Sequence, residues 1–489
     1  MKQSGSEPSA VDGGFGWIVL SASFINQVIL LGYVKAAGVL FVEWQEYFHV
    51  GSKEVGWVGI ILAFCGPLSG LIAGGLTPRF GSRPVSLVGG VTTIIAIAVT
   101  SFSSELWHVY ALSTVTAIGM GLAFQPSITV VGFYFKKRIN IANGVAFSGV
   151  GAGIIVVPPL LQFLCNKFQW RGALLICGAL MLITVVCALL FRPTDRERYF
   201  MLKSADERKA SNENSNNGHP VITFISTKII NLCNYLGLDL IWRYPRFGML
   251  ALSYSLAGFG YYSSVVFFSS RAVHDAKIPK QDASFLVSAI GVGSLIGRAG
   301  HGFLIHSKII GILQLYVVSG FVAAVSCFLN PLSKAFLSLL LCALSFGLFS
   351  GALLAVSLMC ARLFLPTESI SRSFGVLILV NGLGIVFGTF TMGYLNDVTG
   401  NYTLSFISAG IGFMMSSSII LLDMLINATC RKQTSDAEGD QKPGDAEAEE
   451  EKALRGTETE QTSTKEGTEV ALVFGEEKKC MIQEPETSV

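Results

Sequence analysis

Charged residues are scarce in this chain of 489 residues. They make up 14% of the sequence, whereas soluble domains carry about 25%. Mean hydropathy is +0.56, and 51% of the residues are hydrophobic. This composition excludes an ordinary soluble domain and indicates a membrane protein with many spans. The net charge of +2 is close to neutral and predicts no nucleic-acid partner.

The motifs of enzymes and metal sites are also missing. The sequence has no helical H-E-x-x-H, no G-x-S-x-G and no phosphate-cradling loop, which argues against an enzyme. Its ten cysteines are scattered without a C-x-x-C pair, so they predict small buried apolar residues and neither a disulfide framework nor a metal site. The sequence contains no ring of like charges and no filter-like repeat, so it gives no support for a channel. We expect no cofactor.

Apolar runs of about twenty residues dominate what is present. Residues 1–11 lack the basic start and cleavage site of a signal peptide, so we expect the first span to stay in the protein. We predict an all-α membrane protein with about twelve transmembrane helices in two six-helix bundles. The spans are centred within 16–40, 54–76, 84–101, 108–131, 142–164, 171–191, 247–269, 283–304, 309–329, 336–361, 374–395 and 403–426.

Polar segments divide the chain into five parts. Residues 193–246 are polar and charged and predict a linker, with Ile229–Tyr244 as an amphipathic helix on the membrane surface. The acidic end of the chain has too little apolar surface to fold, so we predict disorder there. The predicted parts are a cytosolic N-terminus (1–15), an N-terminal bundle (16–192), a cytosolic linker (193–246), a C-terminal bundle (247–429) and a disordered cytosolic tail (430–489).

The short loops and the last residues suggest orientation and a partner. Basic residues gather on the side of the linker, which the positive-inside rule assigns to the cytosol together with both termini. These residues, Arg79, Arg83, Lys136, Lys137 and Arg138, predict a role in topology or gating and in contact with anionic membrane lipid. The ending Thr487–Val489 has the hydroxyl, aliphatic and carboxylate pattern that PDZ domains bind, although so short a pattern also arises by chance.

Two cations stand inside apolar spans. Arg298 lies within 283–304, and a guanidinium at membrane depth is unfavourable unless it faces water, a partner or an anionic ligand. Snorkelling is the alternative, but the next full charge, Lys308, is ten residues or about 15 Å further along a helix. Lys35 in the first span is open to the same two interpretations. A cationic pair in apolar spans is what a small organic anion requires.

Two short motifs flank the first and fifth spans: one contains Asp12, Gly13, Gly14 and Trp17, and the other runs from Tyr134 to Gly144. Together they resemble the two signatures of the monocarboxylate transporter family, a branch of the major facilitator superfamily. The glycines allow a tight turn and Trp17 anchors at the headgroups. The resemblance implies the major facilitator fold, transport by alternating access at the plasma membrane and a single-span immunoglobulin-type escort glycoprotein. It also implies that Lys35 takes part in substrate and proton binding.

One position departs from the proton-coupled members. They carry an Asp one helical turn before the span-eight Arg, where this chain has Ser294. The departure leaves two functions open: a carrier of small monocarboxylates, with or without a proton, or a proton-independent carrier of aromatic amino acids, creatine-like or other zwitterionic solutes. Members of the second kind lack the span-one Lys. We predict substrate contacts at Arg298, Lys35, Ser294, Asn143 and Tyr33, with helix packing as the alternative for the last two, and a filler or helix-end role for His301.

Overall fold

The computed structural model describes residues 12–203 and 233–439 of the chain. These residues are helical almost throughout, and none of them belongs to a strand. The chain divides into two compact units, Met1–Leu421 and Leu422–Val489, with the boundary inside the last helix. All the residues of interest for function lie in the first unit.

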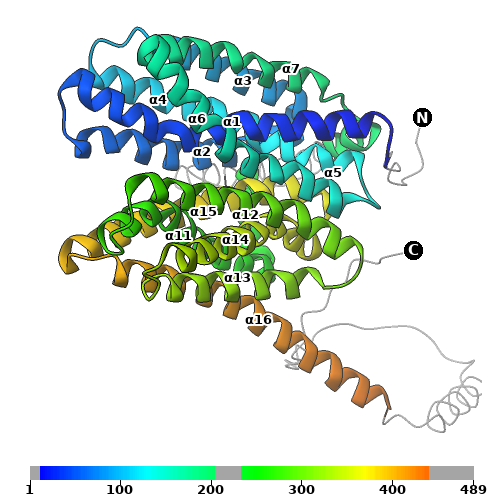
Figure 1. Ribbon diagram of the computed structural model, residues 1–489. Coiled ribbons are helices and arrows are strands. Elements are labelled where there is room, and N and C mark those ends of the chain that lie inside the picture. Colours follow the sequence, from blue (N-terminus) through cyan, green and yellow to red (C-terminus); the bar gives the residue numbers. More distant parts are fainter. Residues whose placement is uncertain (1–11, 204–232, 440–489) are drawn as a thin grey trace, which may run out of the picture. The chain divides into compact units, whose positions relative to one another are not determined.

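The N-terminal group of helices forms one bundle (Figure 1). Its longest helix contains predicted span five and the first half of predicted span six, and the chain turns between them at Gln169, where the backbone leaves the helical region (φ 59°, ψ 169°). The helices are α1 (Phe15–Phe48), α2 (Ser52–Phe80), α3 (Ser82–Thr100), α4 (Leu106–Thr129), α5 (Val131–Tyr134), α6 (Ile139–Leu180) and α7 (Leu182–Leu190).

The C-terminal group forms the second bundle. Its last helix continues to Gly439, so the predicted start of disorder at residue 430 is wrong: the Lys, Gln, Ala and Glu residues there favour helix, and no glycine interrupts them before Gly439. Residues 440–489, with the predicted PDZ ligand, lie outside the described residues. The elements are α10 (Asp239–Arg243), α11 (Pro245–His274), α12 (Lys280–His306), α13 (Ile312–Leu329), α14 (Phe336–Phe364), η1 (Thr367–Ser369), α15 (Ile370–Thr399) and α16 (Thr403–Gly439).

Nine helical stretches in the described parts of the chain are long and apolar enough to cross a membrane. The stretch Ile139–Leu190 among them holds two predicted spans, and α11 and α12 are not among the nine. Both helices are long enough, but they carry more polar side chains, including Arg298. The predicted twelve spans therefore agree with the helices.

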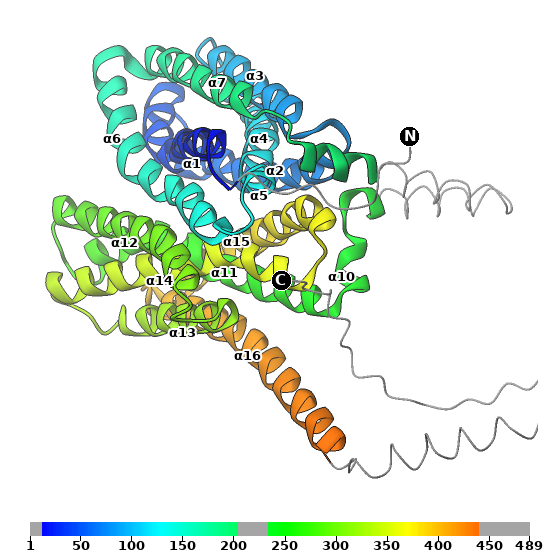
Figure 2. The same ribbon diagram turned by 90° about the vertical axis from the view of Figure 1, so that its right-hand side faces the viewer.

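The two bundles meet along two helix pairs, α2 with α15 and α6 with α12 (Figure 2). Glycines permit the approach: a Cβ on Gly74 would lie 2.9 Å from the Ser371 carbonyl oxygen, and one on Gly144 would lie 3.1 Å from that of Arg298. Close backbone contact is how helices gain packing energy in lipid, which offers no hydrophobic drive.

The linker packs against the bundles where it is described. Residues 195–203 are helical, and the predicted amphipathic helix Ile229–Tyr244 is broken at Gly237, whose φ of 84° ends a helix. Arg372 Nη1 donates to the Asn234 carbonyl oxygen at 3.2 Å, so this segment lies against α15. Residues 204–232 are outside the described part. We call the end of the bundles near residues 195–203 the linker end, and the opposite end the far end.

Candidate functional site

Arg298 lies in α12 and is only 5% exposed. Its Nε donates to Ser294 Oγ at 3.0 Å, one helical turn earlier, which fixes the guanidinium in place. Among the described residues neither terminal nitrogen has a hydrogen-bond or ion-pair partner, and neither is enclosed by protein. An arginine held by Nε with two free Nη groups is arranged to bind a carboxylate.

Lys35 reaches from α1 to the opposite bundle. Its Nζ lies 3.9 Å from the ring centroid of Tyr262 and 5.5 Å from that of Tyr261, both in α11. The charges of Lys35 and Arg298 are close enough to repel each other. No carboxylate in the described chain pairs with either residue. The two cations predicted separately therefore lie in facing bundles within electrostatic reach of each other, with aromatic rings beside Lys35 and no acid paired to either in the described chain.

Ser294 occupies the place that an acid fills in the coupled members. It is fully buried, and its Cα and Oγ lie 2.8 and 2.9 Å from a Cβ built on Gly351 of α14. The Ser294 hydroxyl has no charge to neutralise the guanidinium that donates to it. The full positive charge of Arg298 is thus available to a ligand.

Tyr33 and Asn143, the other two predicted contacts, differ in their surroundings. Tyr33 is buried in the core of the N-terminal bundle near Cys165 and Cys177. Residues two apart on a helix point about 200° apart, so Tyr33 faces inward where Lys35 faces α11. Asn143 lies one helical turn before Phe147 on the same face of α6. The Phe147 ring packs against the ring of Phe374 in α15, with ring centroids 6.0 Å apart. Asn143 therefore faces the interior between the bundles.

His301 is more deeply buried than the predicted filler or helix-end role implies. It follows Arg298 by three residues on the same face of α12 and is 1% exposed. Sequence reasoning placed it at the margin because α12 ends only five residues later, at His306. The helix contact at the neighbouring Gly302, where a Cβ would overlap the Asn140 carbonyl oxygen, explains the burial.

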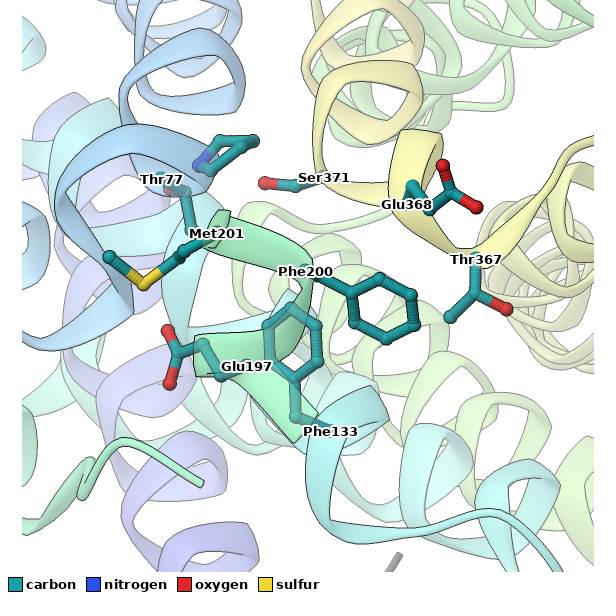
Figure 3. A pocket seen from close by; sticks show the side chains of 9 residues that line it. Thr77, Phe133, Glu197, Phe200, Met201, Thr367, Glu368 and Ser371 are labelled. Atoms are coloured by element: carbon teal, nitrogen blue, oxygen red, sulfur yellow. The ribbon is translucent and has the colours of Figure 1, made fainter. Parts of the chain in front are cut away.

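The linker end of the site is closed by contacts between the bundles. Gln125 Nε2 donates to the carbonyl and hydroxyl oxygens of Ser371 at 2.8 and 3.1 Å, and Lys203 pairs with Glu368 at 2.6 Å. A small, partly open pocket lies there, and none of the described residues that line it is cationic (Figure 3). Its lining consists of Thr77, Pro78, Phe133, Glu197, Phe200, Met201, Thr367, Glu368 and Ser371.

Glu197, from the segment after α7, lies against the junction of α2 and α3. Its Oε1 accepts the backbone N–H of Ser82 at 2.7 Å, at the start of α3. Burial raises the pKa of Glu197, although the hydrogen bonds from Ser82 partly oppose this. Arg79 and Arg83, predicted to act in topology or gating, have no ion-pair partner in the described chain, and Arg79 is exposed beside Phe80. The polar contact at this junction is therefore made by Glu197.

The two signature motifs contact each other. Asp12 Oδ1 accepts the backbone N–H groups of Lys136, Lys137 and Arg138 at 2.8, 2.9 and 3.3 Å, just before α6 begins. Trp17 packs edge-on against Phe135, with ring centroids 5.2 Å apart. The side chains of the three basic residues remain exposed. Asp12 thus holds the loop that leads into α6 beside the start of α1, a role that the sequence alone did not suggest.

Replacing Asp12 by alanine is expected to lower the free energy of unfolding by about 1 kcal/mol, since three N–H groups lose a charged acceptor. Burial raises the pKa of Asp12, but the three hydrogen bonds outweigh it, so the pKa is lowered overall. The stabilisation is therefore present at every pH above the ordinary value of about 3.9 and is lost only below it. Thermal unfolding in detergent at neutral pH is the measurement. Asp12→Asn should retain part of the effect, and equal stability of all three proteins would contradict a stabilising role for these hydrogen bonds.

Known proteins resemble the chain over most of its length. A family model described as Major Facilitator Superfamily matches residues 22–329, and one described as Uncharacterised MFS-type transporter YbfB matches residues 242–421. Monocarboxylate transporter 13 of Bos taurus is 29% identical over 418 residues, covering 84% of this chain and 90% of the relative. Monocarboxylate transporter 12 of Xenopus laevis is 26% identical over 422 residues, covering 85% and 90%. Monocarboxylate transporter 2 of Homo sapiens is 29% identical over 421 residues, covering 85% and 87%.

A solved structure shares the fold. The fucose:proton symporter of E. coli covers 84% of this chain and is itself covered to 99%, with a TM-score of 0.61 and 14% sequence identity. An identity this low supports a common architecture and carries no information about the substrate. The predicted resemblance to monocarboxylate transporters and the predicted two-bundle membrane fold are both confirmed.

Proposed function

The chain belongs to the major facilitator superfamily and is a multi-pass secondary transporter, not an enzyme, and we propose that it moves small monocarboxylates or related organic anions across the plasma membrane by alternating access. The observation that carries the proposal is Arg298, buried with two free Nη groups beside Lys35 and without an acid among the described residues. Such a site is complementary to one carboxylate. Saturable uptake of radiolabelled carboxylates by proteoliposomes tests it, since a channel would not saturate.

The contacts at the linker end suggest how access alternates. Gln125 with Ser371 and Lys203 with Glu368 join the bundles at that end, while Lys35 touches the opposite bundle only through aromatic rings. In alternating access these polar contacts break when α2 moves from α15 and α6 from α12. An incoming carboxylate would draw Lys35 from Tyr262 towards Arg298 and so couple binding to the approach of the bundles.

We expect weak or no proton coupling, because Ser294 cannot titrate where the coupled members have an acid. Initial uptake should differ little between acidic and alkaline external pH. Ser294→Asp places a carboxyl one turn before Arg298, so uptake should then rise at acidic pH, by up to about tenfold per pH unit for one proton. The measurement combines initial uptake with recording of internal pH. Ser294→Asn, which adds similar bulk without titrating, is the control. A steep acid dependence in the native protein would refute the expectation.

The second candidate function is proton-independent transport of aromatic amino acids, creatine-like or other zwitterionic solutes. The absence of a titrating group at Ser294 and the rings of Tyr261 and Tyr262 beside Lys35 favour it. A zwitterion brings its own cation, however, and the site already holds two. Competition between a simple carboxylate and an aromatic amino acid for uptake separates the two functions.

The proposal also covers the orientation of the protein in the membrane and its lipid and protein partners. Both termini are cytosolic by the charge of the short loops, which places the linker end at the cytosol. The exposed side chains of Lys136, Lys137 and Arg138 suit anionic lipid at that face. An immunoglobulin-type escort glycoprotein and a PDZ domain at Thr487–Val489 are the proposed protein partners, and the latter segment is outside the described residues.

A further inference from the structure

Arg362 is a partly buried arginine without an acidic partner at the linker end of α14. It lies in the last turn of that helix, two residues before the helix ends at Phe364. Its Nε and Nη2 are enclosed by protein and have no hydrogen-bond partner. No carboxylate of the described chain forms an ion pair with it. Its third nitrogen, Nη1, is not enclosed, so an ion from outside can reach the guanidinium.

A second guanidinium lies against the same glycine of the opposite bundle. Gly132 of α5 is buried, and a Cβ built on it would overlap Arg362 Nη2 and lie 3.1 Å from Arg362 Cζ. Arg196, in the helical segment 195–203, is 6% exposed and donates through Nη1 to the Gly132 carbonyl oxygen at 3.2 Å. Gly132 therefore has one guanidinium on its carbonyl group and another where a side chain would stand.

The two positive charges act on each other across the contact between the bundles. Like charges at this distance repel, and the repulsion is stronger in a partly buried site than in water. The acids described at the linker end are engaged elsewhere, because Glu197 is bound to the start of α3 and Glu368 to Lys203. The enclosed N–H groups of Arg362 add the cost of unmade hydrogen bonds. An anion beside the two guanidiniums would relieve both penalties.

We propose that Arg362 and Arg196 form an anion site at the linker end, which takes a doubly charged phosphate group and, when occupied, holds α5 and α14 together. Two adjacent guanidiniums offer two charges and several donors, whereas one carboxylate neutralises only one of them. A phosphate group carries close to two charges at neutral pH and three acceptor oxygens. Inorganic phosphate and the headgroup of a phosphatidate lipid share this chemistry. The site is separate from Arg298 and does not depend on the identity of the transported solute.

Thermal unfolding of the full chain in detergent, titrated with inorganic phosphate and with potassium chloride at equal ionic strength, tests the site. A ligand that binds only the folded protein raises the unfolding temperature, so phosphate should raise it for the native protein more than chloride does. Arg362→Met should increase the half-saturating phosphate concentration about tenfold or more, the value of a charge-assisted hydrogen bond. Without phosphate this variant should unfold at the native temperature or above it, because methionine leaves no unpaired charge.

Matched variants and a lipid arm complete the experiment. Arg243→Met removes an equal charge from an exposed position in the linker and should respond to phosphate as the native protein does. Arg298→Ala should also respond normally, which separates this site from the transport site. Arg362→Lys keeps the charge without the planar fork and should bind phosphate with intermediate strength. The native and Arg362→Met proteins are also compared in vesicles of phosphatidate and of phosphatidylcholine.

Each outcome decides for or against the site. A phosphate response that is lost in Arg298→Ala and kept in Arg362→Met would place phosphate in the transport site and overturn the inference. The lack of a phosphate-specific response both in detergent and in phosphatidate vesicles would overturn it too. A response confined to phosphatidate vesicles and lost in Arg362→Met would support the site and identify its ligand as a lipid. If Arg362→Met unfolds well below the native temperature without phosphate, Arg362 is a structural contact and the inference fails. The proposed function fails separately, if the native protein takes up no carboxylate.

Discussion

Arg298→Ala is expected to abolish the uptake of small carboxylates while leaving the protein folded and at the membrane surface. The guanidinium has no acidic partner in the described chain, so its loss leaves no unpaired protein charge behind. Removing the protein's member of a buried, hydrogen-bonded ion pair with a ligand weakens the binding free energy by about 2–5 kcal/mol. Uptake at low substrate concentration should therefore fall about a hundredfold or more. Initial uptake per molecule of reconstituted protein is the measurement.

Two further variants define the role of this charge. Arg298→Lys should also be impaired, because a point charge lacks the planar fork and cannot donate through Nε to Ser294 Oγ while binding a carboxylate through two more nitrogens. Arg198→Ala removes an equal charge from an exposed position and should transport normally. Normal uptake by the Arg298→Ala protein would show that the anion binds elsewhere.

Gly297→Ala is expected to destabilise the protein strongly. A Cβ at this position would overlap the Leu348 carbonyl oxygen and lie 3.2 Å from the Ala352 nitrogen, both in the backbone of α14. Backbone atoms cannot rotate away, so α12 and α14 would have to move apart in the part of the bundle that holds Ser294 and Arg298. We expect the free energy of unfolding to fall by about 3 kcal/mol or more, and the yield of folded protein to be low. Thermal unfolding in detergent and size-exclusion profiles are the measurements.

The same helix supplies the control, three residues further on. A Cβ at Gly300 meets no atom within 4 Å. Gly300→Ala should be neutral or slightly stabilising, since alanine favours helix over glycine by about 1 kcal/mol. Similar losses in both variants would mean that helix contact does not set the stability of α12. Normal folding and uptake with Gly297→Ala would mean that α14 yields more easily than its backbone contact implies.

The sequence predicted the helices well because their signal is local. An apolar run of about twenty residues fixes a span by itself, and the polar linker that separates two groups of six is equally plain. Arg298 and Lys35 could be chosen for the same reason: a charge in an apolar run is unfavourable without a ligand or a partner. Their proximity across the two bundles could not be derived from either span alone.

The rotation of each helix about its own axis could not be predicted from the local sequence. Tyr33 and Lys35 are two residues apart in α1, yet one packs in the bundle core and the other reaches α11. Nothing in the first span alone says which face turns inward, because both faces are apolar. Glu197 was missed for a related reason: its partner Ser82 is 115 residues earlier in the chain, and only the fold brings them together.

The contact between Asp12 and the loop before α6 joins two parts of the chain that are synthesised at different times. Asp12 is made early, but the backbone N–H groups that donate to it are 124 to 126 residues further along. At a translation rate of about 5–20 residues per second, these groups follow on the order of ten seconds later. The contact can therefore form only after the first four spans have been synthesised, which makes it a late step in the assembly of the N-terminal bundle.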